Sequence, residues 1–131
     1  MDYTKFDDFR QWKNSQVLRL IEISDITKEL TAAAGHNDRV SFQMLLGERE
    51  TPIQQVWELE ERIRRALLTL PREDAIRCHE LLHGAAAERP EEAPLCEQVA
   101  RYQRLLDTVI AADRSLSERM SGNKSFYRLL R

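Results

Sequence analysis

The sequence contains almost no signals for β-structure. It has no sustained alternation of apolar and polar residues, no Asn-Gly or Asp-Gly hairpin turn, and few clusters of valine, isoleucine and threonine. These are the features that usually mark strands and the turns between them. A sheet is therefore not expected, and the periodic apolar positions of the chain are best explained by helices.

The chain also lacks a long apolar run. Even the stretch "ALLTL", residues 66–70, stops after about five residues, whereas about 18 are needed to span a bilayer. The first residues, "MDYTKFDDFRQW", contain no positively charged segment followed by an apolar core, which argues against a secretory signal. We therefore expect a cytoplasmic protein that does not enter a membrane.

Neither sign of charge predominates, and cysteine is scarce. The 20 Lys and Arg residues nearly offset the 22 Asp and Glu residues, for a net charge of −2. This balance provides no electrostatic basis for binding nucleic acid or an anionic membrane. Cys78 and Cys96 lie in apolar helical patterns without a disulfide framework around them, so both are expected to be buried thiols in a reducing compartment.

What the chain does contain is apolar residues at helical spacing. The spacing predicts helices over residues 4–34, 42–70, 72–87 and 94–121, with Gly35 ending the first and Asp38 capping the second. Leu46 and Ile53 keep the same phase across Pro52, so we expect one kinked helix there; a break at Thr51-Pro52 is the alternative. On the third helix, Ala75, Cys78, His79 and Leu82 share one side.

The expected fold is all-α, a single domain over residues 1–131 that forms an antiparallel up-and-down bundle built on a long helical hairpin. Residues 123–131 form a tail that is expected to be mobile.

One short motif suggests metal chemistry. His79-Glu80-Leu81-Leu82-His83 matches H-E-x-x-H, in which two histidines on one helix face hold zinc and the glutamate activates a bound water. A third ligand and a substrate-aligning strand are missing, and Arg77 lies nearby, so we predict that no metal or other cofactor is bound and that the protein is not an enzyme. The alternative is a metal-dependent hydrolase in a helical bundle, of the DinB type, in which His36 joins His79 and His83.

The long hairpin and the last helix carry a second pattern. A leucine-rich helix and a short polar turn are followed by Leu45, Leu46, Glu48, Arg49 and Ile53, and Asp113 interrupts the apolar row of the last helix. This pattern, over residues 17–70 and 102–120, resembles flagellar type III export chaperones of the FliT and FlgN type. Pro52 and the proline-rich linker after residue 84 depart from the family pattern.

The resemblance implies a cytoplasmic protein without catalytic residues that holds a flagellar axial subunit before export. Such a protein needs an apolar groove or a mobile apolar helix that receives an amphipathic segment of the client. The candidate client-binding residues are Leu116, Met120, Phe126, Tyr127 and Leu130. We expect the tail to detach and expose or complete this site. Alternatively, the same side chains close the bundle or form a homodimer interface.

Overall fold

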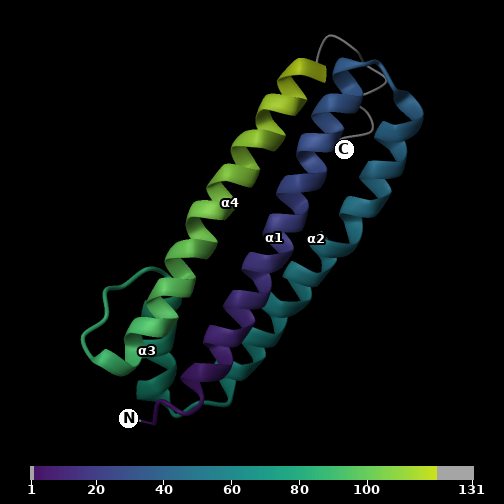
Figure 1. Ribbon diagram of the computed structural model, residues 1–131. Coiled ribbons are helices and arrows are strands. Elements are labelled where there is room, and N and C mark those ends of the chain that lie inside the picture. The colour runs from purple at the N-terminus through teal and green to yellow at the C-terminus, as the bar shows by residue number, and fades with distance from the viewer. Residues whose placement is uncertain (1, 121–131) are drawn as a thin grey trace.

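The computed structural model describes residues 2–120, which fold into three long helices and one short helix. The long helices are α1 (Phe6–Gly35), α2 (Arg39–Leu68) and α4 (Ala93–Met120). The short helix α3 (Arg72–Leu82) and the 3₁₀ turn η1 (Pro90–Glu92) lie at the end of the molecule where α1 begins (Figure 1). Residues 2–120 contain no strand. The expectation of an all-α helical bundle is confirmed.

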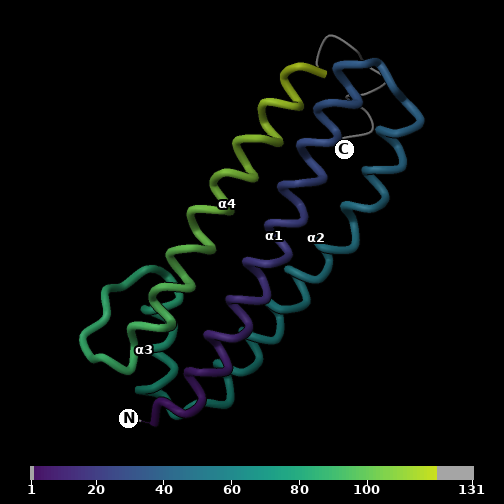
Figure 2. Tube along the Cα trace, in the orientation of Figure 1, coloured from purple at the N-terminus to yellow at the C-terminus, as the bar shows by residue number. Residues whose placement is uncertain are grey.

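The central element of the bundle is α1, which packs against both α2 and α4. The chain rises through α1, descends through α2, turns through α3, and rises again through α4 (Figure 2). α2 therefore runs antiparallel to α1, as expected for an up-and-down bundle, whereas α4 runs parallel to α1, its principal neighbour. α2 and α4 make few contacts with each other, and this feature positions the candidate site.

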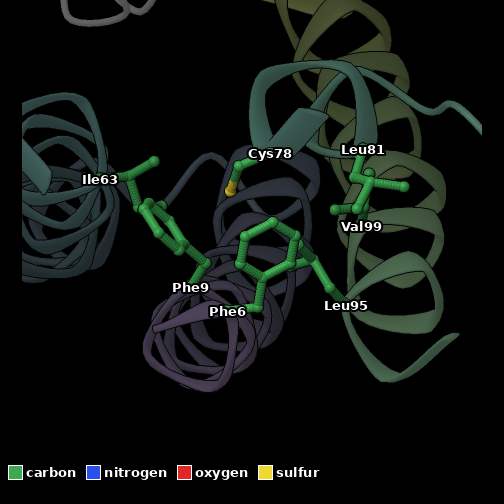
Figure 3. Close-up of a cluster of buried hydrophobic side chains, with 7 residues drawn as sticks. All are labelled: Phe6, Phe9, Ile63, Cys78, Leu81, Leu95 and Val99. Atoms are coloured by element: carbon green, nitrogen blue, oxygen red, sulfur yellow. The ribbon is translucent and has the colours of Figure 1, made fainter. Parts of the chain in front are cut away.

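The core consists of three apolar clusters stacked along α1. The cluster nearest α3 is built from Phe6, Phe9, Ile63, Cys78, Leu81, Leu95 and Val99. In Figure 3, Phe9 lies beside Ile63 of α2 and Phe6 beside Leu95 of α4, with Cys78 pointing toward the two rings. The middle cluster contains Leu20, Ile23, Val56 and Val109. The cluster at the opposite end contains Leu30, Ala33, Phe42, Leu45, Leu116 and Met120. Burying each large side chain stabilises the fold by roughly 1.5–3 kcal/mol.

The turn between α1 and α2 is held by backbone and side-chain caps. α1 ends at Gly35, but the left-handed residue that terminates it is Asn37, with a φ of 53°. The N–H groups of Asn37 and Asp38 donate to carbonyl oxygens of the last turn, as in a Schellman motif. The Asp38 side chain accepts a hydrogen bond from the Ser41 N–H, so the expected N-cap of the second helix is confirmed.

α2 is one helix that includes Pro52, as its apolar phase predicted. Its most buried row differs in detail from the predicted stripe. Leu45 is buried and Leu46 only partly so, and Arg49 and Pro52 occupy the next two positions of the buried row. The spacing therefore identified the helix correctly but did not reveal that a charged residue faces the interior.

α3 is shorter than predicted and ends at Leu82, not at Ala87. The cause is Gly84, whose φ of 97° reverses the backbone while Ala85 and Gly84 donate to the carbonyls of Glu80 and Leu81. Its buried face also differs: Leu81 and Cys78 are buried, Leu82 is half-buried and His79 is exposed. Because α3 ends at Leu82, the residues after it form a loop that leads through η1 to α4.

Candidate functional site

A groove runs between α2 and α4 with α1 as its floor. It exists because both flanking helices pack on α1 and scarcely on each other. The cavity has a volume of about 1280 Å³, which is above the range of about 300–1,000 Å³ typical of small-molecule pockets. We call it the α2–α4 groove, and its principal lining residues are Lys13, Leu20, Ile23, Ile53, Val56, Trp57, Glu60, Val99, Tyr102, Leu106 and Val109.

Both ends of the α2–α4 groove are bounded. At one end, Arg49 of α2 donates hydrogen bonds to Thr27 of α1 and to Asp113 of α4, which lines the groove. At the other end, His79, His83 and neighbouring residues of α3 and its loop line the groove. On α2 the lining extends from Ile53 to Leu67, a length of about 20 Å at 1.5 Å per residue. The groove therefore has the length of about four helical turns.

The walls between these ends are largely apolar. Ile53, Tyr102 and Leu106 are only partly buried and pack onto the middle core cluster from the groove side. Trp57 lies on α2 at the edge of the groove and is 74% exposed. A large exposed aromatic side chain beside an apolar groove is typical of a binding surface, because such residues contribute much of the energy of protein interfaces.

A polar cluster interrupts the floor of the groove. The Lys13 ammonium lies 3.7 Å from the centroid of the Tyr102 ring and 3.7 Å from Oε2 of Glu60. Gln16 donates to the same Glu60 oxygen at 2.8 Å and to the Val56 carbonyl at 3.1 Å. Burial lowers the pKa of Lys13 below its usual value, and the nearby Glu60 charge opposes this shift.

The predicted client-binding residues divide into two groups. Leu116 and Met120 are buried in the core cluster at the end of the bundle where α1 connects to α2. Neither of them lines the groove. Phe126, Tyr127 and Leu130 lie outside the described residues. A role of these five residues in client binding stays a prediction, and for Leu116 and Met120 it requires α4 to move away from α1 and α2.

The histidines do not come together as a three-ligand site. The rings of His79 and His83 meet edge to face with centroids 4.1 Å apart, and His83 Nδ1 lies 2.8 Å from the His79 carbonyl oxygen. His36 caps α1 at the turn into α2, which lies at the opposite end of the bundle from α3 (Figure 1). Among residues 2–120, no three His, Cys, Asp or Glu side chains are grouped so that they could hold a metal ion.

The cysteines differ from each other. Cys78 is fully buried, as expected, and burial raises the pKa of its thiol to about 12, which disfavours the reactive thiolate form. Cys96 is only half-buried and its thiol lies 3.6 Å from the Ala85 carbonyl oxygen. The expectation that both thiols are buried therefore holds for Cys78 alone.

Sequence reasoning missed Lys13, Gln16, Trp57 and Tyr102 as site residues. Lys13, Gln16 and Thr27 occupy positions of the buried row of α1 that continues through Phe9, Leu20 and Leu30. Polar residues at these positions were a detectable signal. Trp57 stood out less, because it adjoins Val56 of the apolar stripe; only the structure places it at the groove edge.

No protein-family model, curated protein or solved structure matches this chain. The resemblance to flagellar export chaperones therefore stays a prediction. Along residues 2–120, none of the helices combines the length and the apolar character needed to cross a membrane.

Proposed function

We propose that the protein is a non-enzymatic chaperone that binds an amphipathic helix of a partner protein in the α2–α4 groove. The main support is the bounded, largely apolar groove, with the length of about four helical turns. A helix placed there would complete a four-helix arrangement, because its apolar face would pack on α1 between α2 and α4.

A helical occupant suits the groove better than a small molecule or an extended peptide. Residues 2–120 contain no sheet edge to pair with an extended strand. The lining side chains come from helices, so they recur at helical spacing and can interdigitate with the side chains of another helix. A catalytic function has less support, since the neighbouring pair His79 and His83 lacks a third ligand among the described residues.

The partner that we propose is a flagellar axial subunit, held in the cytoplasm before export. This assignment rests on the sequence resemblance, in which Arg49 and Asp113 take part. These two residues form the ion pair at one end of the groove, so the resemblance and the groove concern the same part of the bundle.

Trp57 provides the direct test. Peptides from the C-terminal helices of flagellar hook-associated, cap and filament proteins are titrated against the full chain by calorimetry. Trp57→Ala should weaken binding by roughly 10-fold or more, since tryptophan is among the residues whose burial by a partner most often contributes about 2 kcal/mol or more to an interface. In a Trp12→Phe background, the fluorescence of Trp57 should shift to the blue when a peptide covers it.

Leu68 provides the matched control. It is another large apolar residue of α2, 75% exposed against 74% for Trp57, and it does not line the groove. Leu68→Ala should leave the affinity unchanged. Equal weakening by the two substitutions, or no binding of any helical peptide, contradicts the proposed function.

A further inference from the structure

Lys13 occupies a position where an apolar residue would be expected. It lies in the buried row of α1 between Phe9 and Leu20, and its exposed fraction is 5%. Placing an ammonium group in such a position carries a desolvation cost, which proteins ordinarily offset with a close, hydrogen-bonded counterion.

The neighbours of Lys13 neutralise its ammonium only loosely. The distance of 3.7 Å to Glu60 Oε2 exceeds the length of a normal hydrogen bond, and that oxygen already accepts from Gln16. The Glu60 side chain is itself 58% exposed, so water screens its charge. Tyr102 contributes a cation–π contact through its ring face. Lys13 therefore keeps capacity for another anionic partner.

The open direction for such a partner is the groove. Lys13, Glu60 and Tyr102 all line it, with apolar residues of α2 and α4 on both sides. A helix with a purely apolar stripe would remove the remaining water from Lys13 and offer nothing in exchange, a cost that acts against binding. A helix with a carboxylate at this point would supply a counterion in a site shielded from solvent, where such a pair is strongest.

We propose that the α2–α4 groove selects an amphipathic helix whose apolar stripe is interrupted by an aspartate or glutamate that pairs with Lys13. This inference rests on the proposed function and adds the chemistry of the partner. The fold already contains an example of the arrangement: Asp113 interrupts the buried row of α4 and pairs with Arg49, a buried cation of α2.

The test uses synthetic amphipathic peptides of about 16 residues, the length of the groove with one further residue at each end. One series carries a glutamate at each apolar stripe position in turn, and the matched series carries glutamine at the same positions. With the full-length protein, at least one glutamate peptide should bind about 10-fold more tightly than its glutamine counterpart. This preference should disappear in Lys13→Met and persist in Lys28→Met, because Lys28 is an exposed lysine of the same helix.

The comparison between the two peptide series requires no protein variant, so it stands even if Lys13→Met alters folding. Equal binding of the two series at every position overturns the inference and leaves the proposed function intact. A glutamate preference that survives in Lys13→Met also overturns it. If no peptide of either series binds, the inference fails together with the proposed function.

Discussion

Glu92 shows how a single buried carboxylate organises the end of the bundle near α3. It is 2% exposed, and the Arg77 guanidinium donates to both of its oxygens, at 2.7 and 3.0 Å. The Tyr3 hydroxyl and the Glu88 N–H donate to the same carboxylate. Glu92 thus joins the residues before α1, α3 and the loop that leads into α4, and this loop forms part of the closed end of the groove.

The stability of the protein should therefore depend on the charge of Glu92. The Arg77 hydrogen bonds lower the pKa of Glu92 from 4.5 to about 2. A carboxylate whose pKa is lower in the folded state stabilises the fold fully above the unfolded value. This contribution should be lost as the pH falls from 4.5 through about 2. Urea unfolding measured across this range should show the decline.

Glu92→Gln should lower the free energy of unfolding at neutral pH by on the order of 2 kcal/mol, because it removes the only buried carboxylate that pairs with Arg77 within residues 2–120. The other carboxylates near the guanidinium, Glu80 and Glu88, are exposed and lie 3.6 and 3.9 Å away. The substitution should also make the decline in acid less steep. The control is Glu91→Gln, which alters an exposed neighbour in the same turn and should behave as the unmodified protein does. If the two variants share one acid profile, the proposed role of Glu92 is wrong.

At the scale of single elements, two glycines should respond in opposite ways to the same substitution. Gly47 lies inside α2, and an added Cβ would meet nothing within 4 Å. Gly47→Ala should therefore raise the free energy of unfolding by about 0.5–1 kcal/mol, since alanine restricts the unfolded chain and favours helix. Urea unfolding followed by circular dichroism measures the change.

Gly84 has equally free surroundings but a φ of 97°. Gly84→Ala should lower stability by about 1 kcal/mol or more, because a Cβ in this left-handed conformation strains the end of α3. The two variants are matched in size and in the absence of neighbouring atoms. A shift of the same sign in both would show that backbone conformation does not govern either site.

The elements illustrate what the sequence could and could not predict. Helix spacing predicted the continuity of α2 through Pro52, because a stripe that keeps its phase requires one axis. It did not predict the early end of α3, since that depends on a backbone reversal at Gly84, and apolar spacing carries no information about backbone conformation. Polar core residues such as Lys13 and Arg49 were missed because periodicity considers apolar residues alone.

At the scale of the whole molecule, the groove follows from which helices pack together. The apolar rows of α2 and α4 are each compatible with several partners, so spacing alone does not determine that both choose α1. The result is an arrangement of three long helices in which the place of a fourth is open over the middle core cluster. For this reason the sequence could predict that the site is an apolar groove, but it could not predict which helices form that groove.

The ion pair between Arg49 and Asp113 is expected to hold α2 and α4 in register at one end of this groove. Its two members differ in environment, with side-chain exposures of 9% for Arg49 and 44% for Asp113. Removing the more exposed partner should therefore cause the larger loss. Asp113→Ala should lower the free energy of unfolding by about 2 kcal/mol, because it leaves the buried guanidinium without its counterion.

Arg49→Met should lower the free energy of unfolding by about 1 kcal/mol or less. Methionine keeps much of the apolar stem of arginine, the freed Asp113 carboxylate stays in water, and the Thr27 hydroxyl still donates to the Ile23 carbonyl. With the cation absent, the double variant should be nearly as stable as Arg49→Met alone, which corresponds to a coupling of more than about 1 kcal/mol.

Asp107→Ala, at an exposed position of α4, should change stability by less than about 0.5 kcal/mol. Urea unfolding of the four variants completes the cycle. Additive losses in the double variant would mean that the two charges act separately and that apolar packing alone sets the spacing of α2 and α4 above the groove.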